Sequence, residues 1–300
     1  MTISRMWVKP WNMKEGFLIG GGLLVTGLLL QWVLGPVEWG LLAWPVNLIL
    51  LILLVLVIIV LYALRRKVYV FEWMMHSGAA VPCLSYAAAL TILMGLLPQV
   101  KGTDVPWLSQ MLRFWPFVLI WTWMMLISAL AALNHLLRWK LREIPFLLNH
   151  LGVVIAIVAA TLGNADIRKL QMTVFTGETE WRALDDAGMV HEPGLAIELH
   201  QFTMEEYPDH TPKRFASDIS VYTEDGKNVR GTVEVNKPLK VNGWKIYQYG
   251  YDVRYGAESP YSVFQMVLDP WIFWVYLGIF MMIAGALCLM FFMDPKPMKS

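Results

Sequence analysis

Three histidines at the edges of long apolar segments are the residues of this chain best suited to chemistry. His76 lies near the start of the third apolar segment, His135 near the end of the fourth and His150 near the start of the fifth. Each lies about 5–10 Å, or two helical turns, from the charged residues bordering its segment. An ionisable group at that depth is costly and implies a partner. A neutral imidazole is an axial ligand of haem iron, and two from facing helices make a six-coordinate b-type site.

The spacing alone leaves a second interpretation open for each histidine. His76 and His135 are close enough to the interface for their rings to reach water or lipid headgroups. His150 follows Pro145, which suits the first turn of a helix, and precedes Gly152, where a neighbouring helix can approach closely. The pattern therefore indicates His150 as the candidate iron ligand and His76 and His135 as further cofactor-binding candidates. It indicates no catalytic residue.

Six apolar segments of 18–24 residues must position these histidines. Each is long enough to cross a hydrocarbon layer of about 30 Å as a helix. A spanning segment must satisfy its own backbone hydrogen bonds, so helices are expected rather than strands. The sequence therefore predicts a polytopic α-helical membrane protein with six transmembrane helices. The segments are Gly16–Leu34, Val46–Leu64, Met75–Leu97, Phe114–Leu137, Pro145–Leu162 and Trp271–Phe292.

The basic residues predict the orientation of these helices. Thirteen Lys and Arg lie outside the polar insert that separates the fifth and sixth segments, and only Lys101 and Arg113 fall on one side of the zigzag. By the positive-inside rule the other side is cytoplasmic. Both termini are then expected inside a bacterial cytoplasmic (inner) membrane, with the insert on the extracytoplasmic, periplasmic side. The eleven residues of the basic side are Arg5, Lys9, Lys14, Arg65, Arg66, Lys67, Arg138, Lys140, Arg142, Lys296 and Lys299.

The insert, roughly residues 163–269, changes from helical to alternating apolar spacing. Turn pairs such as Asp225-Gly226 and Asn242-Gly243 separate its apolar runs. We therefore predict an antiparallel all-β domain, either a sandwich or a partly open barrel, inserted between helices 5 and 6. The expected strands are Leu195–His200, Asp218–Tyr222, Thr232–Val235, Trp244–Tyr249 and Tyr261–Met266.

Charge and cysteine content exclude several kinds of protein. The insert carries more acidic than basic residues, which argues against nucleic acid as a partner and against strong attraction of the insert to anionic lipid. Membrane lipid is an expected partner of the chain. Cys83 and Cys288 both fall inside predicted helices. The sequence therefore holds no CxxC redox pair and no CxxCH haem-attachment motif, which excludes a thiol oxidoreductase and a c-type cytochrome.

Seven short motifs follow one another along the chain: Gly95–Gln99, Phe146–Gly152, Gly177-Glu178, Tyr207–Asp218, Val235–Leu239, Gly243–Gln248 and Asp269–Trp271. In this order they resemble the ResB/CcsB family of system II cytochrome c biogenesis, with Leu96 where the family has Thr. The resemblance covers about three quarters of the chain, residues 75–293. It divides the chain into an N-terminal two-helix addition (1–74), ResB-like helices 3–5 (75–162), the β domain (163–269) and helix 6 with a tail (270–300).

The resemblance implies a function. In this family the CcsB half acts with a CcsA protein to move haem across the membrane and present it for attachment to CxxCH motifs of exported apocytochromes c. It implies that a membrane histidine of the CcsB half contributes to the haem site. The resemblance implies that the Trp-rich haem-presenting loop belongs to CcsA. This chain has no WxWD-like segment, and its Trp121 and Trp123 fall inside a predicted helix. The chain is therefore expected to be a non-catalytic subunit of a holocytochrome c synthase complex, with b-type haem (haem b) as cofactor.

Two other functions fit the same residues. One is a ResB-like haem-binding or structural subunit of a respiratory or other redox membrane complex. The other is a non-haem assembly scaffold whose outer domain only docks a client.

Overall fold

The computed structural model describes residues 7–99, 107–138, 140–209 and 211–292. They form two units, one of residues 1–165 with 271–300 and the other of residues 166–270. Several residues used above lie outside the described residues, namely Arg5, Lys101, Lys296 and Lys299.

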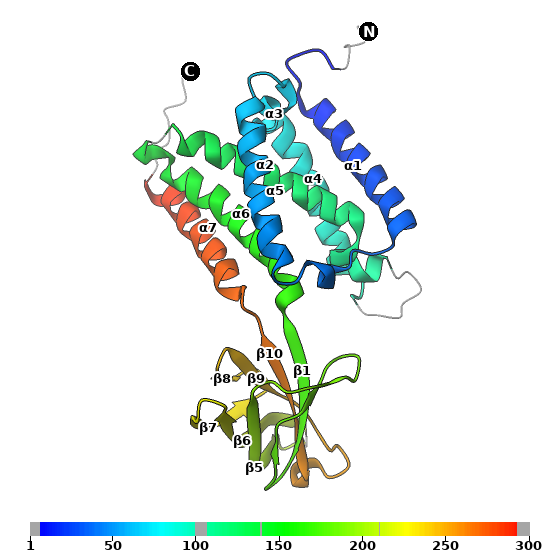
Figure 1. Cartoon of the computed structure of the whole chain (residues 1–300), viewed down its shortest axis with the longest axis vertical. Helices are drawn as coiled ribbons and strands as arrows, with labels where there is room; N and C mark the ends of the chain where they lie inside the picture. Colours follow the sequence, from blue (N-terminus) through cyan, green and yellow to red (C-terminus); the bar gives the residue numbers. More distant parts are fainter. Residues whose placement is uncertain (1–6, 100–106, 139, 210, 293–300) are drawn as a thin grey trace. The chain divides into compact units, whose positions relative to one another are not determined.

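The first unit is helical, and the described residues contain six helices long and apolar enough to cross a membrane. The chain is therefore a multi-pass membrane protein, and Figure 1 shows its long helices. Short helices connect several of them: α3 (Tyr69–Trp73), η1 (Trp39–Leu42), η2 (Leu108–Arg113), η3 (Leu141–Glu143) and η4 (Asn164–Asp166). The six long helices are α1 (Met13–Leu34), α2 (Val46–Leu64), α4 (Ser77–Leu96), α5 (Trp115–Leu136), α6 (Ile144–Gly163) and α7 (Ile272–Phe292).

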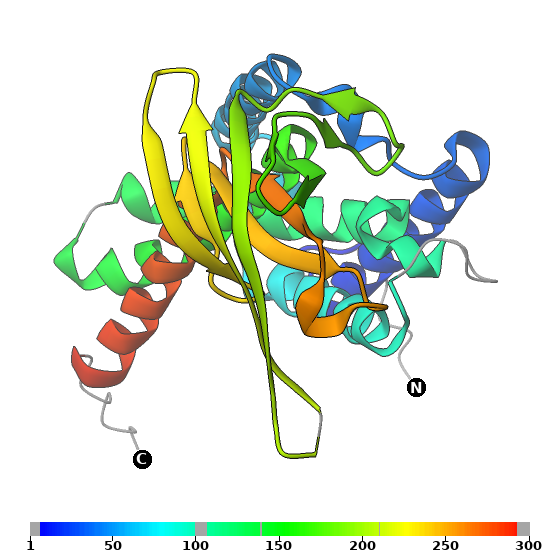
Figure 2. The same ribbon diagram turned by 90° about the horizontal axis from the view of Figure 1, so that it is seen from below.

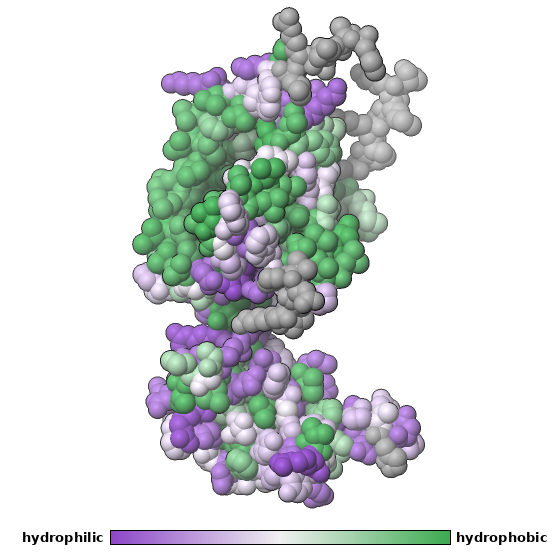
Figure 3. All heavy atoms as spheres, turned by 90° about the vertical axis from the view of Figure 1, so that its right-hand side faces the viewer, coloured by the Kyte–Doolittle hydropathy of each residue, from purple (hydrophilic) through white to green (hydrophobic). Residues whose placement is uncertain are grey.

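Helix α5 is the central helix of this unit. In its most apolar window 61% of the residues are buried, against 11–22% in the other five spans. The remaining helices turn most of their apolar side chains outward, and apolar residues cover the surface of the helical unit seen in Figure 3, with hydrophilic residues at its two ends. Such a surface suits a hydrocarbon solvent rather than water.

The backbones of helices α6 and α7 approach each other closely at two glycines, Gly152 and Gly278. A Cβ atom at Gly152 of α6 would lie 2.6 Å from the carbonyl oxygen of Gly278 in α7, and one at Gly278 would lie 2.7 Å from the backbone nitrogen of Ala156. Small residues permit this approach between helices in a membrane. The neighbour that Gly152 admits is therefore α7.

We expect Gly152→Val to destabilise the helical unit, because the added atoms meet backbone that cannot move independently. Overpacking of this kind costs about 1–3 kcal/mol. The thermal midpoint of the detergent-solubilised protein measures the effect. Gly22→Val is the matched control, since a Cβ at Gly22 of α1 has no neighbour within 4 Å. Equal midpoints for the two variants would contradict the assigned helix contact.

The second unit is an antiparallel β sandwich of two sheets. The six-stranded sheet has the order β4-β3-β1-β10-β9-β8 and the four-stranded sheet the order β2-β5-β6-β7. A single apolar core is formed by residues of both sheets, including Met172, Ile197, Ile219 and Phe264, all fully buried. The strands are β1 (Arg168–Phe175), β2 (Thr179–Glu180), β3 (Ala183–Leu184), β4 (Val190–His191), β5 (Leu195–Glu206), β6 (Pro212–Thr223), β7 (Asn228–Glu234), β8 (Leu239–Val241), β9 (Trp244–Tyr251) and β10 (Tyr261–Leu268), with the short helix η5 (Gly256–Glu258) before β10.

Strands β5 and β6 are the longest, and their paired ends extend beyond the rest of the four-stranded sheet. They pair from Leu195↔Thr223 to Glu206↔Pro212, whereas β7 follows β6 only as far as Ala216. Figure 2 shows these ends projecting as a two-stranded ribbon. Phe202 and Phe215 at its base both stack on Tyr251 of β9, which ties the ribbon to the other sheet.

Candidate functional site

The structure brings two of the three candidate histidines together. His135 lies in the last turn of α5, and His150 lies in the second turn of α6. Both rings pack against the ring of Phe146, with centroid distances of 4.0 Å for His135 and 3.8 Å for His150. The planes are tilted by 32° and 18°, so the three rings form a stack with Phe146 in the middle.

This stack bears on how iron could be bound. An axial imidazole points a ring nitrogen at the metal, whereas His135 and His150 turn ring faces toward each other with Phe146 between them. In this arrangement the two rings cannot be the two axial ligands of one iron. One of them can be a ligand while the other supports Phe146.

The hydrogen bonds of the histidines leave one nitrogen of each ring open. Nδ1 of His150 lies 3.0 Å from the carbonyl oxygen of Phe146, and Nδ1 of His135 lies 2.8 Å from Oε2 of Glu143. Since a carbonyl or a carboxylate can only accept, Nδ1 is the donor in both bonds. In a neutral ring the lone pair is then on Nε2, and a ring held through Nδ1–H is the usual arrangement of a metal-ligating histidine.

His76 occupies a separate position. It is the N-cap residue of α4 with an extended backbone, so it precedes the helix in which we had placed it. Its ring is exposed, and Nδ1 donates to the carbonyl oxygen of Glu72 at 2.8 Å. It borders a hollow of about 440 Å³ lined in part by Trp11, Tyr69 and Trp73. No ring contact joins His76 to the other two histidines among the described residues.

Other metal chemistry has little support in the part of the chain that the structure describes. No group of three or more His, Cys, Asp or Glu side chains there could hold a metal ion. Cys83 is buried in the helical unit, and His191 and His200 pair with Asp185 and Ser220 in the β sandwich. His210 lies outside the described residues.

Two partners of the candidate site were missed from the sequence. Phe146 reads as an ordinary apolar residue, and Glu143 as a charged residue of the connection before the fifth segment. Phe146 and His150 are four residues apart and lie on one face of the helix, and this spacing is the signal in the sequence that indicates the contact between the two rings. The pairing of Glu143 with His135 depends on the turn between α5 and α6, which no local pattern indicates.

Comparison with known proteins finds a family that is similar to this region. Residues 138–259 match the model of the ResB-like family, which confirms the resemblance found in the sequence. The matched stretch contains α6 with His150 and most of the β sandwich, and it excludes His76 and His135.

Several curated relatives are similar to this chain over shorter stretches. The cytochrome c biogenesis protein CcsB of Prochlorococcus marinus (strain NATL1A) is 29% identical over 102 residues, which cover 34% of this chain and 23% of that protein. The cytochrome c biogenesis protein Ccs1 of Pyropia yezoensis is 39% identical over 60 residues, or 20% and 14% of the two chains. The chloroplastic CCS1 protein of Oryza sativa subsp. japonica is 36% identical over 73 residues, or 22% and 13%. The chain thus spans about a quarter or less of these three relatives.

Among solved structures, the cytochrome c haem lyase CcmF aligns with 95% of this chain and 46% of its own, with a TM-score of 0.41 and 14% identity.

Proposed function

We propose that this chain is a ResB/CcsB-like membrane subunit that helps move and present haem for covalent attachment to exported apocytochromes c. It acts with a CcsA-like partner and is itself a non-catalytic part of the holocytochrome c synthase complex. One observation supports this most strongly: the ResB-like match includes the helix that carries His150, and the Nδ1–H of that ring is already bonded within the helix. The relatives named above are cytochrome c biogenesis proteins.

The side chains fit b-type haem through one ligand. Nε2 of His150 has no hydrogen-bond partner among the described residues, so it is free to ligate iron. His135 cannot be the second ligand of the same iron, because Phe146 lies between the two rings. A second ligand would come from the CcsA-like partner, with His76 as the weaker candidate within this chain. Bound haem iron would supply redox chemistry at this site.

The proposal includes an arrangement in the membrane. The β domain (163–269) is inserted between transmembrane helices 5 and 6 and faces the extracytoplasmic side of a bacterial inner membrane, with both termini cytoplasmic. Helices 3–5 (75–162) with helix 6 (270–300) are the ResB-like core, and residues 1–74 are an addition to it. The bias of the basic residues toward one side of the helix zigzag supports this orientation.

Two measurements on the purified full chain test the proposed function. A Soret absorbance is expected, together with co-purification of a CcsA-like membrane protein. Absence of haem from both the chain and its complex would contradict a haem-handling role and favour a scaffold. Co-purification with quinone-linked redox subunits in place of a CcsA-like protein would favour a subunit of a respiratory complex.

Reporter tags test the orientation. A tag before Met1 and another after Ser300 should be protected from a protease added to intact cells. A tag inserted at Asp225-Gly226, a turn between β6 and β7, should be cleaved once the outer membrane is opened. A C-terminal tag accessible only from outside would contradict the proposed orientation.

A further inference from the structure

Four cationic side chains gather at one end of the six-stranded sheet. Lys240 of β8 is the direct neighbour of Lys245 of β9, and both Lys245 and Lys169 of β1 have Val267 of β10 as their partner. The three lysines therefore form one row across four adjacent strands. Arg168 precedes Lys169 at the same end of β1. We call Arg168, Lys169, Lys240 and Lys245 the basic row.

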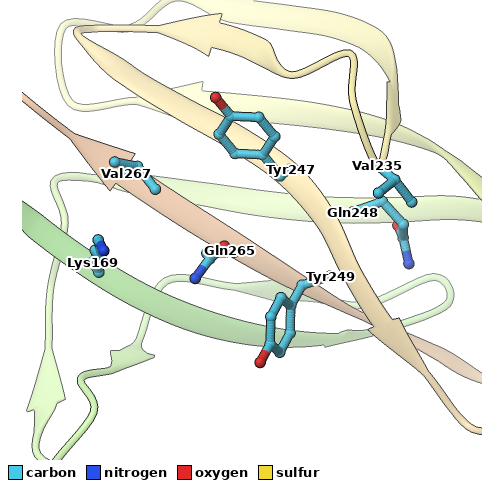
Figure 4. A pocket seen from close by; sticks show the side chains of 7 residues that line it. All are labelled: Lys169, Val235, Tyr247, Gln248, Tyr249, Gln265 and Val267. Carbon is cyan, nitrogen blue, oxygen red and sulfur yellow. The ribbon is translucent and has the colours of Figure 1, made fainter. Parts of the chain in front are cut away.

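The three lysines of the row lie on the outer face of the sheet, whereas Arg168 alternates with Lys169 and pairs with Leu268 on the core side, at the very end of β1. Leu170, Val241 and Ile246, the neighbours of the lysines along the strands, point into the core and are buried, so the lysines beside them point outward. Figure 4 shows Lys169 beside Val267 on this face, with Tyr247, Tyr249 and Gln265 further along the strands. The face is slightly hollowed, with a depression of about 370 Å³ that includes these residues.

The basic row differs from the other cations of the sandwich. Each remaining Lys and Arg of this unit pairs with a carboxylate: Arg182, Lys213, Arg214, Lys227, Arg230, Lys237 and Arg254. No such partner occurs for the four members of the row among the described residues. Asp166, the carboxylate nearest in the sequence to Arg168 and Lys169, and Asp269, which follows β10, have interactions of their own.

This arrangement carries an energetic cost. Like charges placed directly opposite on neighbouring strands destabilise a sheet, and Lys240 and Lys245 are such a pair. Neighbouring strands are about 4.7–4.9 Å apart, so the whole row is compact. A compact group of unpaired cations in a domain that is acidic in total is stabilised when it meets an anionic surface.

The covalent chain keeps this end of the sheet close to membrane-spanning helices. Lys169 follows three residues after Asp166, the end of the fifth span, and Leu268 lies four residues before Ile272, the start of α7. A chain advances at most about 3.6 Å per residue, so Lys169 lies within about 11 Å of the end of its helix. The headgroup layer extends about 5–7 Å beyond the hydrocarbon on each side. Chain length alone therefore keeps Arg168 and Lys169 near the headgroup layer, and the strand register places Lys245 and Lys240 two and three strands away from them.

We propose that the basic row binds the phosphates of anionic phospholipid headgroups and so holds the β sandwich against the membrane surface. Only the basic row makes this contact with lipid, so it is compatible with a domain whose total charge is acidic. It concerns the placement of the sandwich and is independent of haem binding and of the side of the membrane on which the sandwich lies.

Hydrogen exchange on the full chain in lipid nanodiscs tests this proposal. In nanodiscs of phosphatidylcholine with about a third phosphatidylglycerol, exchange of residues 239–246 should be at least about fivefold slower than in phosphatidylcholine alone. Salt near 1 M should remove the difference, because screening acts within about 3 Å there. A variant that lacks the row's charges carries Arg168→Gln, Lys169→Gln, Lys240→Gln and Lys245→Gln. Hydrogen exchange of residues 239–246 in this variant should be equal in the two lipids.

A control variant with the same loss of charge should keep the lipid effect. It carries Arg182→Gln, Lys213→Gln, Lys227→Gln and Lys237→Gln, one Arg and three Lys from elsewhere in the sandwich. Equal exchange of the wild-type protein in the two lipids would overturn the proposal. So would protection by soluble glycerol phosphate in phosphatidylcholine nanodiscs, or protection that requires an acidic partner protein and ignores the lipid.

Discussion

Replacing His150 with glycine should release haem from the purified protein complex. If Nε2 of His150 is an axial ligand, its removal leaves iron without one of its two strong bonds, and any haem that remains should lose low-spin character and shift in potential. Haem content should fall at least about tenfold, since losing even the groups that orient a metal ligand costs about 10–100-fold in affinity. Pyridine haemochrome and visible spectra measure both effects.

Rescue by imidazole separates ligation from a structural role. Glycine leaves a space the size of the missing ring beside Phe146, and imidazole added to the medium can fill it. Low-spin haem should then return. A variant that is merely misfolded would not respond in this way. His191→Gly serves as the matched control, because His191 is an exposed histidine of the sandwich whose ring pairs with Asp185.

Variants of the other two candidate histidines show whether His150 or another histidine is the ligand. His135→Ala should retain haem with altered affinity at most, because His135 reaches the site through Phe146. Unchanged haem and spectrum in His150→Gly would refute the assignment. Loss of haem only in His76→Ala would move the site to the N-terminal end of α4.

The helices of this protein could be predicted from sequence because their signal is local. Hydropathy over a single segment defines a membrane helix, and the predicted Val46–Leu64 has the same bounds as α2. The starts of two helices differ more: α1 begins at Met13, three residues before the predicted Gly16, and α4 begins at Ser77, two residues after the predicted Met75. Met75 and His76 continue the apolar run but adopt a turn and an extended cap, a choice made by contacts such as the bond of His76 to Glu72.

The strands could be predicted only where alternation of apolar and polar residues stood apart from the apolar helices. β1 alternates through Leu170, Met172 and Val174, but it comes soon after the apolar run of a membrane helix, which obscures the alternation, and it was not predicted. The edge strand β8 has only three residues and is visible chiefly through its pairing with β9. The grouping of Arg168, Lys169, Lys240 and Lys245 depends on strand register, which joins residues far apart in the chain. For the same reason, the stack of His135 on Phe146 required the structure.

Removing the β sandwich should abolish maturation of the client cytochrome c while leaving intramembrane haem bound. The structure makes this excision feasible. Lys169 of β1 and Val267 of β10 are paired neighbours in an antiparallel ladder, so their Cα atoms lie about 4.5–5.5 Å apart. Residues 170–265 can therefore be replaced by Asn-Gly, which together with the retained Met266 makes a three-residue hairpin connection. The contact of Gly152 with Gly278 lies within the helical unit and is retained.

Three measurements on this truncated chain separate the roles of the two units. Haem-stained cytochrome c in cells should fall to background, because the domain that would receive the client is gone. Haem bound per purified chain should stay unchanged, because the described part of the sandwich holds no ligand set and His150 remains in α6. The thermal midpoint of the helical unit shows whether the truncation is folded. Haem loss from a folded truncation would mean that the sandwich supplies a ligand, whereas normal cytochrome maturation would mean that the membrane helices alone engage the client.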